Sequence, residues 1–445
     1  MRVSSDSDNL LQFRHWTLDV RHQTPQIYEI NSIFHSFEIF SYIPRVPVPL
    51  LSASPLSLCH PWQFLLFSLM SEVYRVPLKI SNFYYPKYTN LTTGVLWSCI
   101  EINAEGSIMM QTGLLDWQIR FRQLDAGGDP LPKLEKLVDW ERFRPDLEAV
   151  RDKERKSNAG RKPFAVILMF KVLVLQSLYN LSDERIEFQI RDRLSFMRFL
   201  GLSLGDAVPD EKTIWLFREQ LTEARVIKRL FQEFDEFLEE KGFSARRGQI
   251  IDASIVEAPR QRNSREENRQ IKAGQIPEDW SDQKKRQKDT DARWTRKNGQ
   301  NYYGYKNHID IDVEHKLIRD YEVTPASVHD SQVFETLLDE DNSSRDVWAD
   351  SAYRSEEKLE ELGKRRFRDH LQRKGCKHKK LTEWEKKGNR TRSRIRSRVE
   401  HIFGVQAMRA GDLIIRTIGL IRAKAKIGLR NLAYNLDRFC VLQGV

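Results

Sequence analysis

The chain has 445 residues, and its 73 Lys and Arg against 63 Asp and Glu give a net charge of +10 and a pI of about 9.3. This balance favours a polyanionic partner. The longest apolar run, Trp62 to Met70, is too short to span a bilayer and lacks the layout of a signal peptide. No CxxC spacing joins the four cysteines, which excludes a disulfide framework and a cysteine zinc site. We expect a protein of the reducing cytoplasm that does not associate with a membrane.

The first 108 residues differ in composition from the rest. They hold seven basic and eight acidic residues, about 14% charged, against about 36% in the remaining 337. Eight of the sixteen prolines also lie here, and they interrupt any periodic apolar pattern. We expect residues 1–108 to be an atypical extension that does not fold independently, with translation naturally starting near Met109. The alternative is a genuine linker or partner-docking arm.

Residues 109–242 carry helical patterns. Apolar residues recur at helical spacing in segments 131–150, 161–179, 182–201 and 224–241. Ser182 and Asp210 are candidate N-caps, and Gly201 is a candidate C-cap. Short helices with exposed basic residues between tight turns predict either a helix-turn-helix-like DNA-binding domain or a purely structural bundle.

From residue 243 onward the period changes to that of strands. Alternating and short apolar runs predict strands at 248–258, 301–313, 316–324 and 346–349. The second and third of these form an antiparallel hairpin. Helices are expected at 329–338 and 355–363, whereas the Gln-, Lys- and Asp-rich stretch 259–300 is expected to be a loop.

Three acidic residues stand out in these elements. Asp252 interrupts the first strand, Asp350 follows the last strand, and Glu400 lies in an Arg-rich helical segment. Clustered carboxylates bind divalent cations, which promote phosphodiester chemistry without sulfur or imidazole ligands. Residues 364–398 hold sixteen Lys or Arg against three Asp or Glu, which favours DNA contact over a merely solvated helix face. The combination indicates a metal-dependent enzyme that acts on nucleic acid.

The elements follow the order of a ribonuclease H-like core: strand with Asp, hairpin, helix, strand with Asp, helix, and finally a helix with Glu. From about Asp116 onward the chain resembles bacterial insertion-sequence DDE transposases, most closely the family named after insertion sequence five. The matching segments are GRKPFAVILMFKVLVLQSLYNLSD, VPDEKTIWLFREQL, IIDASIVEAPRQRN, YYGYKNHIDID, TPASVHDS, WADSAYRS and RSRIRSRVEHIFG. The resemblance implies an α/β catalytic domain at 243–445, a mixed sheet flanked by helices with a basic insertion at about 364–398. An all-helical DNA-binding domain at 109–242 would precede it.

The resemblance also implies a chemistry. Asp252, Asp350 and Glu400 would be catalytic and would hold two Mg²⁺ or Mn²⁺ ions, because their mutual repulsion favours cation binding. The phosphodiester at each element end would be hydrolysed, and the released 3′-hydroxyl would attack target DNA without a covalent protein intermediate. The implied partners are double-stranded DNA of the element ends and of the target, and at least one further copy of the chain. The enzyme would be cytoplasmic and associated with the nucleoid.

Several residues are candidate DNA contacts: Arg392, Arg396, Arg398, Arg409, Tyr353, Lys306 and His308. Arg396 and Glu400 share a helix face, so the alternative for Arg396 is an ordinary i,i+4 ion pair. Tyr353 matches a DxxY pattern of the family, although packing at a strand end explains it equally well. Lys306 and His308 share one face of a strand that either contacts phosphate or is a solvent-facing edge.

Two positions depart from the family pattern. Ser393 stands where Tyr is usual, and Ala407 stands where Lys is usual, with Arg409 as a candidate replacement. Without such a replacement, this copy would be weakened or inactive. Two other functions remain open: a related nuclease that cuts without strand transfer, and a transposase-derived regulator that binds DNA without catalysis.

Overall fold

The computed structural model describes residues 100–102, 108–110, 116–151, 162–375 and 380–444. The first two short segments are strands β1 (Ile100–Ile102) and β2 (Ile108–Met110), which pair antiparallel. The expected boundary at residue 108 therefore falls inside β2. The rest of the expected extension, residues 1–99 and 103–107, lies outside the described residues, so its expected lack of independent folding and of native translation stays a prediction. All described residues belong to one compact unit.

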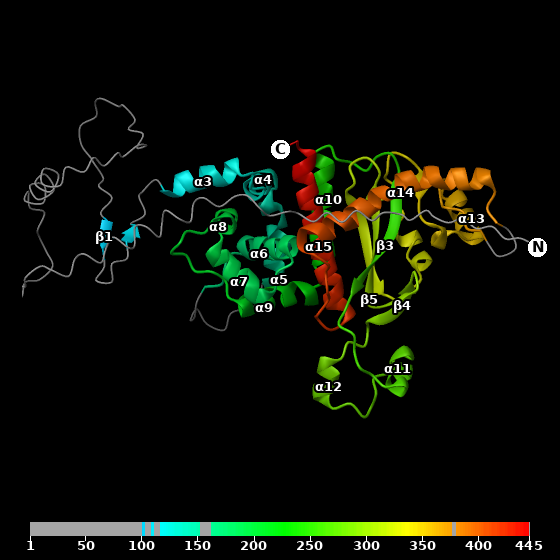
Figure 1. The fold of residues 1–445 in the computed structure, drawn as a ribbon, viewed down its shortest axis with the longest axis horizontal. Coiled ribbons are helices and arrows are strands. Elements are labelled where there is room, and N and C mark those ends of the chain that lie inside the picture. The colour runs from blue at the N-terminus through cyan, green and yellow to red at the C-terminus, as the bar shows by residue number, and fades with distance from the viewer. Residues whose placement is uncertain (1–99, 103–107, 111–115, 152–161, 376–379, 445) are drawn as a thin grey trace, which may run out of the picture. The chain divides into compact units, whose positions relative to one another are not determined.

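The segment from residue 116 to residue 240 contains only helices where it is described (Figure 1). Ser182 Oγ accepts from Arg185 N and Asp210 Oδ1 accepts from Thr213 N, which confirms both predicted N-caps. The elements are α3 (Asp116–Ala126), α4 (Leu131–Leu137), a 3-10 helix (Trp140–Phe143), α5 (Arg144–Arg151), α6 (Val166–Tyr179), α7 (Asp183–Asp192), α8 (Leu194–Leu200), α9 (Glu211–Glu223) and α10 (Ile227–Glu240).

Two of the expected helices are broken into shorter ones. Asp139 is extended, and its side chain accepts from Glu141 N, so it starts a new 3-10 turn instead of continuing α4. Arg193 is likewise extended between α7 and α8. Gly201, with φ of 69°, ends α8 as predicted.

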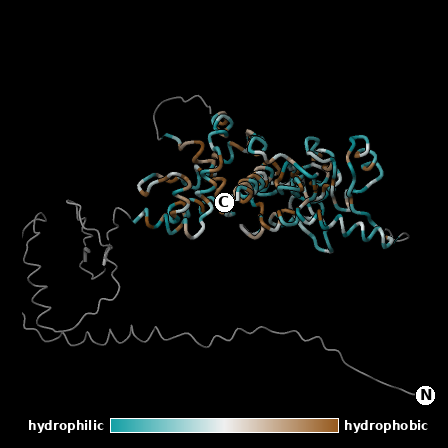
Figure 2. Tube along the Cα trace, turned by 90° about the horizontal axis from the view of Figure 1, so that it is seen from above, coloured by the Kyte–Doolittle hydropathy of each residue, from teal (hydrophilic) through white to brown (hydrophobic). Residues whose placement is uncertain are grey.

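Helix α6 lies at the centre of the helical region, with nine of its fourteen residues buried. Figure 2 shows hydrophobic residues gathered in the interior of this region, with hydrophilic residues toward its outside. Across the part of the chain that the structure describes, no single helix is both long and apolar enough to cross a membrane. By length and composition alone the pair α6 and α7 meets this requirement, with a bend of 102° between them.

The sheet has six strands in the order β4-β5-β3-β7-β8, with β6 also paired to β5. The central strand β3 pairs antiparallel with β5 and parallel with β7. This arrangement confirms the predicted strands and the predicted hairpin of β5 and β6. The strands are β3 (Gln249–Glu257), β4 (Arg293–Lys297), β5 (Gln300–Asp312), β6 (Ile318–Pro325), β7 (Asp346–Trp348) and β8 (Arg368–Asp369).

The expected loop at 259–300 is wrong, because this segment contains α11 (Arg265–Lys272), α12 (Asp282–Gln287) and β4. Ser264 and Glu267 form a reciprocal capping box that starts α11, and Trp280 donates to Glu267 Oε1. Conversely, the expected helix at 329–338 is two separate 3-10 turns, Asp330–Gln332 and Glu335–Leu337.

Three further helices complete the fold: α13 (Glu356–Lys364), α14 (Glu383–Ala410) and α15 (Leu420–Leu442). Much of the basic segment thus belongs to α14 itself, whose N-terminus has a capping box of Thr382 and Glu385. Ile250 and Ile251 on β3 belong to two different apolar clusters, so the sheet is covered on both faces. The predicted fold class, a mixed sheet flanked by helices and preceded by a helical region, is confirmed.

Candidate active site

Asp252 lies on β3, the central strand of the sheet. Its Oδ1 accepts from Ala253 N at 2.8 Å, and its Oδ2 accepts from Arg396 Nη1 at 2.5 Å. The side chain is only 14% exposed. Burial raises the pKa of Asp252, the charge of Arg396 lowers it, and the nearby Asp350 raises it further. This carboxylate is therefore costly to ionise unless a cation accompanies it.

Asp350 follows β7 directly and is the N-cap of the 3-10 helix Ser351–Tyr353. Its Oδ1 accepts from Ala352 N at 2.7 Å, which fixes the side chain at the carboxyl end of β7. Because β3 and β7 are parallel neighbours with Ile250 opposite Trp348, Asp252 within β3 lies level with Asp350, just beyond the end of β7. The electrostatic effect of Asp350 on Asp252 reflects this proximity.

Glu400 lies on α14, and Arg396 joins it to Asp252. Arg396 Nη2 donates to Glu400 Oε1 at 2.8 Å, so the ordinary i,i+4 ion pair is present. The same guanidinium also reaches Asp252, a contact that no local pattern predicts. Glu400 remains 60% exposed. One arginine therefore links two of the three predicted catalytic acids.

The acidic side chains of the site can be compared with the ligands that a divalent cation prefers. Carboxylate oxygens are the ligands that Mg²⁺ and Mn²⁺ prefer, and the mutual repulsion of Asp252 and Asp350 would be relieved by positive charge. In the described part of the chain, no three His, Cys, Asp or Glu side chains come together as a group that could hold a metal ion. Asp252 and Asp350 by themselves are suitable ligands for a cation. In the described structure Glu400 does not join them directly, and Arg396 bonds both Glu400 and Asp252.

Comparison with known protein families identifies the family of the chain that carries this site. Residues 119–220 match the family described as "Transposase domain (DUF772)", and residues 243–436 match the "Transposase DDE domain". The chain belongs to the DDE transposases. It is a DDE-type DNA transposase, and Asp252, Asp350 and Glu400 all lie within the matched DDE domain. Membership of the insertion-sequence-five family stays a prediction.

Among solved structures, the transposase is similar to a piggyBac transposase in a synaptic complex with hairpin DNA. The two chains share 13% sequence identity, and the match covers 71% of this chain and 74% of that chain. The TM-score is 0.34, which is too low for the two chains to be compared element by element. The identification therefore depends on the two family matches.

Arg392 lies one turn before Arg396 on α14 of the transposase. Burial lowers the pKa of Arg392, and the positive charges of Arg373 and Arg354 lower it further, whereas Asp369 raises it. Its Nε is buried without a hydrogen-bond partner among the described residues, and its only bond is a long one of 3.5 Å to Asn389 Oδ1. A phosphate group would relieve this crowding of positive charge. Sequence reasoning missed Arg373, which no motif distinguishes, and Arg354, although it lies in the matching segment WADSAYRS.

The structure does not bring all predicted DNA contacts to the acids. Arg398 Nη1 donates to Val313 O at 2.5 Å, so this side chain ties α14 to the end of β5. Lys306 Nζ donates to Val328 O and to Asp330 Oδ1, each at 2.7 Å, and is 12% exposed. The side chain of Arg409 lies outside the described residues.

His308 and Tyr353 are both buried. His308 has no exposed surface, and its Nε2 lies 2.9 Å from Thr324 Oγ1. Because β5 pairs with β3 on one side and with β4 and β6 on the other, it is an interior strand, and the alternative of a solvent-facing edge is wrong. Tyr353 is 1% exposed and packs against Phe334, with ring centroids 5.4 Å apart. Neither ring is at the surface for DNA contact in this arrangement.

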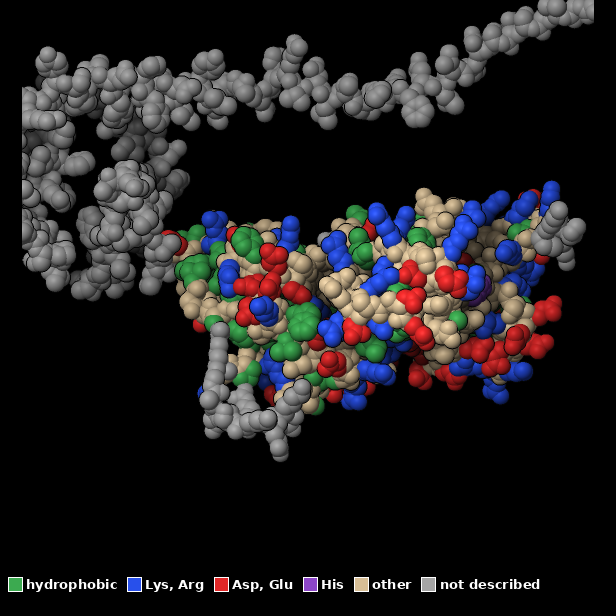
Figure 3. All heavy atoms as spheres, turned by 90° about the horizontal axis from the view of Figure 1, so that it is seen from below, with side chains coloured by type: hydrophobic (Ala, Val, Ile, Leu, Met, Phe, Trp, Pro, Cys, Tyr) green, Lys and Arg blue, Asp and Glu red, His purple; other side chains and the backbone are tan. Residues whose placement is uncertain are grey.

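The surface of the half that contains the sheet carries both signs of charge. In Figure 3, Lys and Arg side chains project along one margin of the half that contains the sheet, while Asp and Glu side chains gather at its end. This pattern agrees with the basic first half of α14 and the acidic first turn of α13.

Proposed function

We propose that this transposase binds the terminal inverted repeats of an insertion sequence, cleaves at its ends, and joins the 3′ ends to target DNA by divalent-metal-dependent phosphoryl transfer. The observation that carries the proposal is the bridge by Arg396 between Asp252 on β3 and Glu400 on α14. It links acids from two separate elements, beside Asp350 from a third, inside a DDE domain.

Each acid has a distinct part in the proposed reaction. Asp252 and Asp350 would hold Mg²⁺ or Mn²⁺, with Glu400 as the third acid of a two-ion site. The ions would supply Lewis-acid stabilisation of the phosphoryl oxygens and an activated water or 3′-hydroxyl. The bonds from Ala352 N and Ala253 N orient the two aspartates before any substrate arrives. The exposed position of Glu400 leaves its side chain free to change rotamer.

Arg396 has two parts to play in this proposal. Without DNA, its guanidinium neutralises the buried Asp252 and the exposed Glu400. Its Nε is buried and unpartnered in the described part of the structure, so a donor remains for a phosphate oxygen. Transfer of the guanidinium from the carboxylates to the DNA backbone would place positive charge beside the scissile phosphate.

The partners follow from the same reaction. Two element ends must be joined to one target, so we propose that at least two copies of the transposase act together on double-stranded DNA. The basic margin of α14 would track the phosphate backbone. We expect the protein to be associated with the nucleoid.

The test is Mg²⁺-dependent cleavage and strand transfer of duplex DNA that carries the element's own ends, with the full chain. Asp350→Asn retains an acceptor for Ala352 N but removes the charge, so activity should fall by roughly 10³-fold or more. Glu357→Gln, an exposed acid on α13, is the matched control and should retain activity. Cleavage without joining would favour the nuclease, and DNA binding without cleavage in the wild type would favour the regulator.

A further inference from the structure

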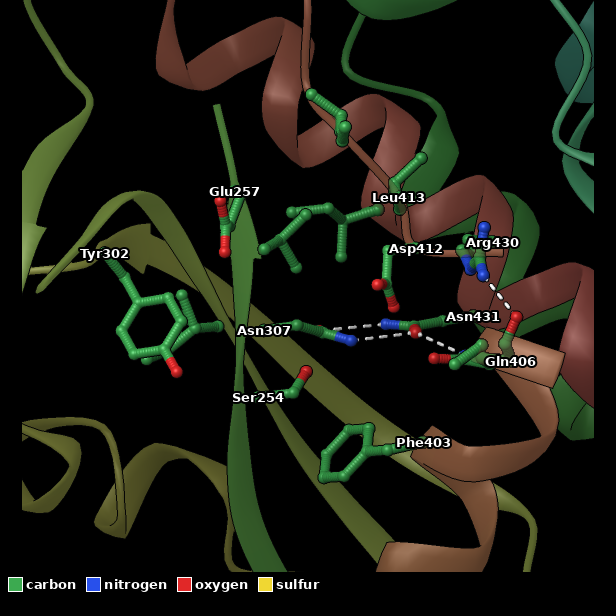
Figure 4. Close-up of a pocket in the computed structure, with 15 residues that line it drawn as sticks. Ser254, Glu257, Tyr302, Asn307, Phe403, Gln406, Asp412, Leu413, Arg430 and Asn431 are labelled. Atoms are coloured by element: carbon green, nitrogen blue, oxygen red, sulfur yellow. Dashed lines mark hydrogen bonds between the residues drawn. The ribbon is translucent and has the colours of Figure 1, made fainter. Parts of the chain in front are cut away.

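A cavity of about 420 Å³ lies on the face of β3 that carries Asp252 (Figure 4). Ser254 lines it and is two residues beyond Asp252 on this face, about 7 Å along the strand. Phe403 and Ala407 also line it, three and seven residues after Glu400 on one face of α14. The cavity therefore adjoins the candidate active site. The distance of about 7 Å from Asp252 to Ser254 corresponds to about two nucleotides of a DNA strand, at about 3.4 Å each.

Arg430 of α15 brings a buried positive charge to this cavity. It is 7% exposed, and its Nη2 donates to Gln406 O and, at 2.8 Å, to Gly411 O. Its Nη1 is buried and has no hydrogen-bond partner among the described residues. Burial lowers the pKa of Arg430, which Asp412 partly opposes. A buried guanidinium N–H without an acceptor is costly, so a ligand acceptor would stabilise it.

The other lining groups narrow the chemistry of that ligand. Asn307 and Asn431 bond each other reciprocally at 3.0 and 3.1 Å, which fixes the cavity floor. Figure 4 shows Phe403 projecting from α14 toward β3, and Asp412 between β3 and Arg430. The carboxylates of Asp412 and Glu257 disfavour a free phosphate, while the charge of Arg430 disfavours an apolar ligand. Donors, acceptors and aromatic rings together are typical of a site for a nucleobase.

We propose that this cavity binds an unpaired base of the DNA substrate, guanine in preference, beside the scissile phosphodiester. Arg430 Nη1 donates to guanine O6 or N7, and the Asp412 carboxylate accepts from its N1–H and N2–H. The ring of Phe403 or Tyr302 stacks on the base. This proposal rests on the proposed function, because an unpaired base next to the catalytic acids is expected only if the enzyme acts on DNA.

The departure at Ala407 agrees with this assignment. The family pattern has Lys here, but Ala407 leaves the cavity open. Arg430 supplies a positive charge from the neighbouring helix, so it is a candidate for the replacement of that Lys. Sequence reasoning missed Arg430, although three polar residues within the apolar pattern of α15, Arg430, Asn431 and Asn435, were a usable signal.

The test is isothermal titration of the full chain, without Mg²⁺, with dGMP, dTMP and inorganic phosphate in separate experiments. We expect dGMP to bind about tenfold or more tightly than either dTMP or phosphate. Asp350→Asn should bind dGMP like the wild type, so a failure of strand transfer is distinguishable from a failure of this proposal. Equal affinity for dGMP and dTMP, or no dGMP binding, would overturn it.

Two variants locate the binding. Arg430→Gln should reduce dGMP affinity at least tenfold, but it also removes two bonds to backbone carbonyls that hold the end of α14. Ala407→Phe removes no hydrogen bond and fills the cavity, so it should abolish dGMP binding without a large change in Tm. Met408→Phe, at a neighbouring position that is 90% exposed, is the matched control. Retention of dGMP binding by a folded Ala407→Phe protein would contradict the assignment.

Discussion

Arg396 on α14 donates to Asp252 on β3 across 144 residues of chain, with 2.5 Å between Nη1 and Oδ2. Burial alone would disfavour the ionised form of Asp252, and the charge of Arg396 opposes this effect. In the absence of DNA, Arg396 is therefore the counterion of the buried Asp252. Contact with DNA would be a second role of the same side chain.

Loss of this counterion should destabilise the fold as well as the activity. We predict that Arg396→Ala lowers the free energy of unfolding by about 2 kcal/mol, because Asp252 stays buried without its partner. Urea unfolding at neutral pH measures this change. Arg394→Ala, an exposed arginine on the same helix, is the control and should change stability by less than about 0.5 kcal/mol. Equal stability of the two variants would show that the bridge does not stabilise the fold.

Arg392 and Arg398, which lie on either side of Arg396 along α14, should differ in their effect on DNA binding. Arg392 has buried Nε without a partner in the described structure, whereas Arg398 is bonded to Val313 O. We predict that Arg392→Ala reduces the slope of log affinity against log salt concentration by about 0.9, the loss of one phosphate contact. Arg398→Ala should leave this slope unchanged. Fluorescence anisotropy with a labelled duplex over a salt series measures both, and a reduced slope for Arg398→Ala alone would reverse the assignment.

Gly304 of β5 is required by the close approach of β3. A Cβ at this position, where φ is 151°, would lie 2.2 Å from Val256 O and 2.8 Å from Ala258 N. We predict that Gly304→Ala destabilises the protein by about 2 kcal/mol or more, because backbone atoms would have to move. Gly363→Ala on α13, where a Cβ meets nothing within 4 Å, should instead stabilise by about 0.5–1 kcal/mol. Thermal unfolding of the two variants tests this opposite pair of signs.

His308 should make stability depend on pH. Burial lowers its pKa to about 4 from an ordinary value of 6.5. The charge of Asp330 raises this pKa to a smaller extent, and the charge of Lys306 lowers it further. The unfolded chain therefore takes up this proton near pH 6.5 and the folded chain only near pH 4. His308 thus makes the free energy of unfolding decrease as pH falls through this window, by about 3 kcal/mol in total.

The measurement is the difference between His308→Gln and wild type in urea unfolding at pH 7, 6, 5 and 4. The difference is needed because Asp235, whose pKa burial raises to about 6, acts in the opposite direction in the same window. We expect His308→Gln to gain stability relative to wild type as pH falls. Gln332→Ala, which changes an exposed side chain that does not titrate, should show a constant difference. A constant difference for both would mean that His308 titrates normally.

Local sequence patterns determined a large part of this fold. The alternation of β3 and β5 and the caps at Ser182 and Asp210 depend on the chemistry of neighbouring residues, so they could be predicted from the chain alone. The patterns failed at 259–300, where a polar composition hid two capped helices, and at Asp139, where a side chain competed for the backbone. Both errors missed local signals, because the capping box of Ser264 and Glu267 and the bond of Asp139 to Glu141 N involve only neighbouring residues.

The candidate site, too, could be predicted from the sequence only in part. The sequence by itself determined which acids stand after or within which elements, and the DDE family match agrees with that order. Only the tertiary structure decided that Arg396 pairs with Asp252 as well as Glu400, that His308 is fully buried, and that Arg430 meets Ala407 in one cavity. The physical reason is that burial and charge pairing depend on segments that are distant in the chain, and no local period encodes them.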